Sequence, residues 1–147
     1  MNNKKTTNQP NMILVWFKAL RPQAAFASIC PVVVGLMIAH RHLGFVGTQG
    51  NMVAFLTLAC AFALQTLSNL VNDYYDFKRG TDKQDRVGFE RAMTTGLISE
   101  EEMRTACFIT LGVAVFLGAL LCWLGGWLIL AVGVTALLFA WLYTATD

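Results

Sequence analysis

Residues 52–71, MVAFLTLACAFALQTLSNLV, form an apolar run of twenty residues without a charged side chain. About 20 mostly apolar residues are the length that an α-helix needs to cross the hydrocarbon core of a bilayer. We therefore predict a transmembrane helix here. The strongly polar sequence NDYYDFKRGTDKQDR follows directly at residues 72–86, so we expect the helix to leave the membrane there.

Three further apolar runs surround this one, AAFASICPVVVGLMIA before it and TACFITLGVAVFLGALLCWL and WLILAVGVTALLFAWLY after it. Each reaches the length of a span, the first once it is extended by its neighbours. A short run at residues 12–20 with Trp16 is typical of an interfacial helix. The sequence thus predicts an all-α, polytopic membrane helix bundle of about four transmembrane helices. We expect a disordered cytoplasmic tail at 1–11, a membrane domain at 12–147, spans near 22–40, 52–72, 105–124 and 127–144, and a cytoplasmic aspartate-rich loop at 72–104.

The composition supports this class. Of the 147 residues, 56% are hydrophobic and 14% are charged, whereas an ordinary soluble domain is about 45–50% apolar and about 25% charged. A disordered chain is excluded, because disorder requires low hydrophobicity and high net charge. The net charge of +2 does not indicate a nucleic-acid partner. The partner that the composition indicates is the lipid bilayer.

The basic residues predict the orientation. Ten of the eleven Lys and Arg residues precede the first span or lie between the second and the third, and only Arg41 lies between the first and the second. Because cytoplasmic loops carry an excess of Lys and Arg, we expect the N-terminus and residues 72–104 in the cytoplasm. The expected location is the bacterial cytoplasmic (inner) membrane.

A polar stripe begins inside the second span. Gln65, Asn69, Asn72 and Asp76 are spaced by four, three and four residues, which places all four on one face of a helix. Polar side chains at membrane depth are costly and usually face a cavity or a partner. Gln65 and Asn69 could line such a cavity, or they could form hydrogen bonds between helices. The carboxylate at the end of the stripe favours a site.

The loop after this span interleaves acidic and basic side chains. Mg²⁺ prefers oxygen ligands and commonly takes one or two carboxylates together with substrate phosphate oxygens, while Lys and Arg bind the remaining phosphate oxygens. The pattern therefore suits a metal–diphosphate complex, although a solvated loop of mutually neutralising charges has the same composition. A bend at Gly80 favours the site. The carboxylates are Asp73, Asp76, Asp82 and Asp85, and the cations are Lys78, Arg79, Lys83, Arg86 and Arg91.

The segment at residues 72–86 resembles the first aspartate-rich motif of the UbiA-type membrane prenyltransferases, whose pattern is N-x-x-x-D followed by further aspartates. Asn72 and Asp76 match this pattern. The extension G-x-D-x-x-D-R, the later Arg91 and T-T-G, the A-L-R-P at 19–22 and the P-V-V-V-G at 31–35 most closely resemble one branch, the 1,4-dihydroxy-2-naphthoate polyprenyltransferases of menaquinone biosynthesis.

The resemblance implies half of a UbiA-type fold and a specific reaction. Family members bind a polyprenyl diphosphate through Mg²⁺, diphosphate departs, and an electron-rich aromatic ring attacks the allylic carbon. In the naphthoate branch the prenyl group replaces the ring carboxylate and CO₂ is lost. Carried over by position, the implied catalytic residues are Asn72, Asp76, Asp82 and Asp85, the implied metal ligands are Asp76, Asp82 and Asp85, and the implied diphosphate contacts are Lys78, Arg86 and Arg91.

The chain departs from the family in two respects. Phe89 stands where the branch usually has proline. Family members are also typically about twice this length and carry a second aspartate-rich motif in their later half. The resemblance therefore implies an incomplete, N-terminal fragment that we expect to be inactive in isolation.

Three alternatives remain from the sequence. The first is a non-catalytic four-helix membrane protein, such as a transporter subunit or an assembly factor. The second is a UbiA-type prenyltransferase for another acceptor, such as 4-hydroxybenzoate or a haem vinyl group; the D-x-x-D-R extension after Gly80 favours the naphthoate. A CDP-alcohol phosphotransferase is disfavoured, because its D-G-x-x-A-R signature is absent.

Overall fold

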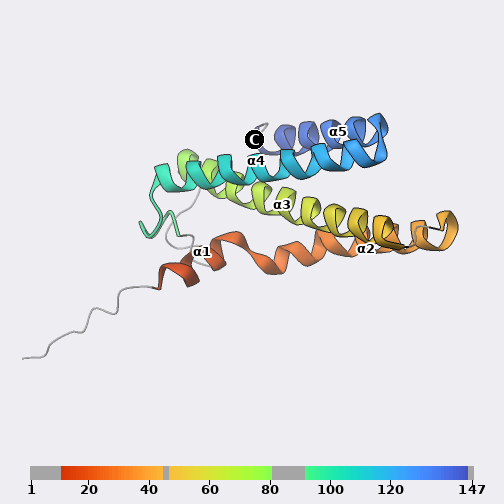
Figure 1. The fold of residues 1–147 in the computed structure, drawn as a ribbon. Helices are drawn as coiled ribbons and strands as arrows, with labels where there is room; N and C mark the ends of the chain where they lie inside the picture. The colour runs from red at the N-terminus through yellow and green to blue at the C-terminus, as the bar shows by residue number, and fades with distance from the viewer. Residues whose placement is uncertain (1–10, 45–46, 81–91, 146–147) are drawn as a thin grey trace, which may run out of the picture.

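The computed structural model describes residues 11–44, 47–80 and 92–145, and every regular element in these ranges is an α-helix, as the sequence predicts. Figure 1 shows the helices as long, nearly parallel rods, with one short helix at the N-terminal end. They are α1 (Met12–Leu20), α2 (Pro22–Leu43), α3 (Gly47–Arg79), α4 (Glu100–Gly125) and α5 (Trp127–Ala145).

Successive long helices run antiparallel, and α3 occupies the centre of the bundle (Figure 1). It packs against α2 on one side and α4 on the other, and it also contacts α1 and α5. The α4–α5 connection is the tight Gly125–Gly126 turn that the sequence predicts. Gly126 adopts φ 84° and ψ −176°, a conformation that is essentially restricted to glycine.

Within the part of the chain that the structure describes, three stretches are long and apolar enough to cross a membrane: Met12–His42, Gly47–Arg79 and Glu100–Gly125. The fourth predicted span corresponds to α5, in which the apolar stretch found among the described residues is shorter, Trp127–Ala136. Large apolar side chains on the outside of these helices are exposed, for example Phe26, Phe116 and Leu128. Apolar side chains on the outer face suit a helix bundle whose solvent is lipid.

The helices extend further than the apolar runs do. Helix α3 continues to Arg79 and ends at Gly80, which has φ 65° and donates its backbone N–H to the Phe77 carbonyl over 3.1 Å. Helix α4 begins at Glu100, behind a capping box between Ser99 and Glu102. Residues 72–79 and 100–104, which the sequence analysis assigned to the loop, are therefore helical.

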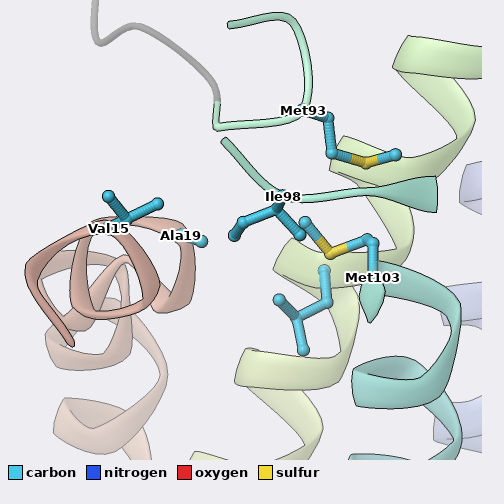
Figure 2. Packing of buried hydrophobic residues seen from close by; sticks show 6 residues of the cluster. Val15, Ala19, Met93, Ile98 and Met103 are labelled. Atoms are coloured by element: carbon cyan, nitrogen blue, oxygen red, sulfur yellow. The ribbon is translucent and has the colours of Figure 1, made fainter. Parts of the chain in front are cut away.

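A small hydrophobic core lies at the end of the bundle where α3 ends and α4 begins. Its members come from α1, α3, the segment before α4, and α4 itself, and Figure 2 shows them converging between these elements. Ile98 and Met103 are only 2% and 1% exposed. This cluster fixes α1 and residues 92–98 beside the polar part of α3; it consists of Val15, Ala19, Leu70, Met93, Ile98 and Met103.

Candidate functional site on the polar face of α3

Five polar residues of α3 share one side of the helix, called here the polar face of α3. At about 100° of rotation per residue, they fall within a sector of about 100°. Asp73 marks one edge of this sector and Asn72 the other, with Asp76 between them. Four of the five form the stripe that the sequence spacing predicts, and Asp73 is the fifth. The members are Gln65, Asn69, Asn72, Asp73 and Asp76.

The inner part of this face is held by hydrogen bonds. Gln65 donates from Nε2 to Oδ1 of Asn69 over 3.3 Å, and Asn69 donates from Nδ2 to the carbonyl oxygen of Leu20 over 3.3 Å. Leu20 is the last residue of α1, so Asn69 makes the interhelical hydrogen bond that the sequence analysis left open as one alternative. Asn69 is 6% exposed, which makes this contact part of the packed interior.

The outer part of the face contains an ion pair whose carboxylate is buried. The Arg21 Nη2 atom lies 2.8 Å from Oδ1 of Asp73, and the Asp73 side chain is 5% exposed whereas that of Arg21 is 35% exposed. Arg21 is the residue between α1 and α2 and adopts a left-handed conformation with φ 49° and ψ 61°. Since Pro22 begins α2, the chain turns at Arg21 and directs its guanidinium toward α3.

Asn72 and Asp76 lie on the flank of this ion pair. Both side chains are half-buried, and both take part in polar interactions. They are about 100° and about 60° from Asp73 around the helix axis, on the same side of it. An amide and a carboxylate, one turn apart and partly open to solvent, thus share the last turns of α3.

Lys78 lies on a different side of α3. Its Nζ atom is 2.8 Å from Oε1 of Glu100, the same oxygen that accepts a hydrogen bond from the Tyr74 hydroxyl over 3.1 Å. Around the helix axis Lys78 is about 160° from Asp76. The structure therefore joins Lys78 to α4 and does not bring it to Asp76.

Four of the predicted site residues, Asp82, Asp85, Arg86 and Arg91, lie outside the described residues. Within residues 11–44, 47–80 and 92–145, there is no group of three or more His, Cys, Asp or Glu side chains able to hold a metal ion. On the polar face of α3, the half-buried oxygen donors are the carboxylate of Asp76 and the amide oxygen of Asn72. Oxygen donors of this kind fit Mg²⁺, which binds through one or two carboxylates and completes its shell with phosphate and water oxygens.

Sequence reasoning missed the pairing of Arg21 with Asp73. Asp73 was assigned to the acidic cluster, with divalent cations or the nearby basic residues from Lys78 to Arg91 as its expected partners. Arg21 and Asp73 are 52 positions apart, and no periodicity connects them. The one available signal was the position of Arg21 at a predicted helix boundary, next to Pro22.

Comparison with known proteins identifies relatives of this chain in sequence. The profile described as "UbiA prenyltransferase family" matches residues 4–146. The 1,4-dihydroxy-2-naphthoate octaprenyltransferase of Escherichia coli is 38% identical over 105 residues, which cover 71% of this chain and 33% of that protein. The protein of the same name from Mycobacterium tuberculosis is 35% identical over 129 residues, covering 88% of this chain and 42% of that protein.

A more distant relative is similar over a shorter stretch. The UbiA prenyltransferase domain-containing protein 1 of Mus musculus is 42% identical over 67 residues, which cover 44% of this chain and 18% of that protein. No solved structure gives a significant match. The chain spans about two fifths or less of the length of the curated relatives that it matches.

Proposed function

Because the chain belongs to the UbiA prenyltransferase family, we propose that it supplies the diphosphate-binding part of a membrane prenyltransferase. The reaction is the transfer of a polyprenyl group from polyprenyl diphosphate to 1,4-dihydroxy-2-naphthoate, with loss of CO₂ and diphosphate. This reaction belongs to menaquinone biosynthesis.

One observation carries the proposal. Asn72 and Asp76 lie one turn apart on the polar face of α3, at the end of a helix whose other turns are apolar enough to cross a membrane. The face thus presents oxygen donors where a lipid-soluble substrate would bring its charged head group. The isoprenoid tail of such a substrate would extend along the apolar part of the bundle, away from water.

The proposed roles of the residues are to hold Mg²⁺ and to contact the diphosphate. Mg²⁺, when bound, neutralises the leaving diphosphate and so favours cleavage of the allylic C–O bond. Asp76 would hold the ion, and Asn72 would orient an oxygen of the diphosphate or of a metal-bound water. Asp82 and Asp85 are proposed as further metal ligands and Arg86 and Arg91 as phosphate contacts, on the resemblance alone.

The choice of acceptor rests on the relatives. The proteins from Escherichia coli, Bacillus subtilis and Mycobacterium tuberculosis are all named 1,4-dihydroxy-2-naphthoate octaprenyltransferases. We therefore favour the naphthoate over 4-hydroxybenzoate, and the family match disfavours a non-catalytic membrane protein. The proposed location is the bacterial cytoplasmic membrane, with the Asp76 end of the bundle in the cytoplasm.

The test is binding of a diphosphate that cannot react. The chain is placed in lipid nanodiscs, and its affinity for farnesyl thiodiphosphate is measured with and without Mg²⁺. We expect Mg²⁺-dependent binding that Asp76→Asn weakens by about tenfold or more, because a metal ligand is lost. Glu101→Gln is the matched control, since it removes an exposed carboxylate from the same end of the bundle. An affinity for farnesyl thiodiphosphate that does not depend on Mg²⁺, or that Asp76→Asn leaves unchanged, contradicts the proposal.

The acceptor is tested on the same sample. With Mg²⁺ and farnesyl thiodiphosphate present, the nanodiscs are titrated with 1,4-dihydroxy-2-naphthoate and, separately, with 4-hydroxybenzoate. We expect the naphthoate to bind more tightly. Tighter binding of 4-hydroxybenzoate would assign the chain to the other acceptor class.

A further inference from the structure

The corner between α1 and α2 is tied to α3 by two polar contacts. Arg21 pairs with Asp73 over 2.8 Å, and the Leu20 carbonyl accepts a hydrogen bond from Asn69. Asn69 and Asp73 are one turn apart, so both contacts lie on the same side of α3. Two contacts at successive turns define the rotation of a helix about its own axis better than one.

The burial of the Asp73 carboxylate makes its ion pair with Arg21 a strict constraint. A carboxylate that is 5% exposed has given up nearly all of its hydration, and the guanidinium of Arg21 supplies the opposite charge. If α3 rotated by a few tens of degrees, Asp73 would leave Arg21 and lose this compensation.

The rotation of α3 determines the direction in which its neighbouring side chains point. Asn72 and Asp76 are fixed to the same helix, about 100° and about 60° from Asp73. Any rotation that separates Asp73 from Arg21 therefore displaces both of these donors by the same angle. A diphosphate site requires its groups within about 10–20° of the productive geometry.

We propose that Arg21 is a positioning residue, which acts through Asp73 to set the rotation of α3 and so aims Asn72 and Asp76 at the diphosphate. The inference rests on the proposed function, because it takes Asn72 and Asp76 as the groups that bind the diphosphate and Mg²⁺. In this proposal Asp73 pairs with Arg21 and does not coordinate the metal, although it lies inside the aspartate-rich segment.

The first arm of the test measures the rotation directly. Cysteines introduced at Phe17 on α1 and Phe77 on α3, both exposed positions, carry spin labels in a chain whose four native cysteines are replaced by alanine. Double electron–electron resonance in nanodiscs gives the distance distribution between the two spin labels. We expect Arg21→Gln and Asp73→Asn each to shift or broaden it by on the order of 3 Å, as a rotation of about 40° does for side chains about 5 Å from a helix axis.

The second arm measures the affinity of each variant for farnesyl thiodiphosphate in the presence of Mg²⁺. The variants carry no spin labels, and binding is measured well below their melting temperatures. We expect about a tenfold loss in Arg21→Gln and in Asp73→Asn, and no larger loss in the double variant, because both changes break one contact. Arg21→Lys keeps the charge and should retain most of the affinity. Lys18→Gln removes a charge from an exposed site on α1 and should alter neither readout.

The outcomes separate this inference from the proposed function. Unchanged distances in Arg21→Gln and Asp73→Asn would overturn it, and so would altered distances with wild-type affinity. Additive losses in the double variant would also overturn it, since they would give the two residues separate roles. If the unaltered chain shows no Mg²⁺-dependent binding, the proposed function fails, while the distances still decide whether Arg21 sets the rotation of α3.

Discussion

The side-chain amide of Asn69 donates to the carbonyl oxygen of Leu20 over 3.3 Å, and so joins α3 to the last residue of α1, 49 positions earlier in the chain. The last carbonyls of a helix have no partner within it, and Asn69 supplies one. Gln65 donates in turn to Oδ1 of Asn69. The polar face of α3 is therefore joined to the α1–α2 corner by this hydrogen bond.

Replacing this amide should cost measurable stability. We expect Asn69→Ala to lower the free energy of unfolding by about 1 kcal/mol, as for other hydrogen bonds between membrane helices. The measurement is SDS titration in mixed micelles. Asn51→Ala is the matched control, because Asn51 belongs to the same helix but is exposed; an equal loss in both variants would contradict a specific role for Asn69.

The two ion pairs should respond differently to salt. Lys78 and Glu100 are 50% and 47% exposed, whereas the Asp73 side chain is 5% exposed. At about 1 M salt the Debye length is only about 3 Å, which screens an exposed pair far more than a buried one. We expect the small change in melting temperature caused by Lys78→Gln to vanish at high salt and the larger change caused by Arg21→Gln to persist. Equal salt dependence would show that the two pairs do not differ in screening.

The segment before α4 should depend on one apolar side chain. Ile98 is 2% exposed and lies between α1 and α4 in the core of Figure 2. Ile98→Ala should lower the free energy of unfolding by about 2–4 kcal/mol, through lost burial and the cavity that remains. The neighbouring Leu97 is 36% exposed, so Leu97→Ala should cost much less. Comparable losses, read from thermal melts, would mean that Ile98 does not anchor this segment.

The turn between α4 and α5 should require glycine at position 126, whose backbone conformation a side chain would strain. Gly126 has φ 84° and ψ −176°, and a side chain there is strained by about 1–3 kcal/mol. Gly112 lies within helical α4 with open space where a Cβ would be, so Gly112→Ala should be neutral or stabilising by about 0.5–1 kcal/mol. Chemical denaturation of both variants tests this, and a tolerated Gly126→Ala would contradict the turn geometry.

The apolar runs predicted most of the fold. The run at residues 12–20 became α1 with the predicted bounds, and the Gly125–Gly126 turn separates α4 from α5. The predicted membrane span ended near residue 72, and the polar stripe predicted a helical face as far as Asp76, whereas α3 continues to Arg79. Apolar length reports where a helix leaves lipid, whereas the helix itself continues through polar residues until Gly80 ends it.

The candidate site could be predicted only in part. Periodicity placed Gln65, Asn69, Asn72 and Asp76 on one face, because such spacing is a local property of a helix. It could not reveal that Asp73 pairs with Arg21 or that Lys78 pairs with Glu100, since these partners are 52 and 22 positions away. Contacts between helices depend on how the helices pack, and a single sequence does not encode that in its spacing.

Prenyl transfer by a hybrid protein tests the central claim most directly. The chain replaces the matching segment of the Escherichia coli relative, and transfer of a prenyl group to 1,4-dihydroxy-2-naphthoate is measured in nanodiscs with Mg²⁺. We predict that the hybrid is active and that Asp76→Asn lowers its rate by about 10–100-fold or more, with Glu101→Gln close to the unaltered hybrid. A folded hybrid that transfers the prenyl group equally well with Asp76→Asn would contradict the account.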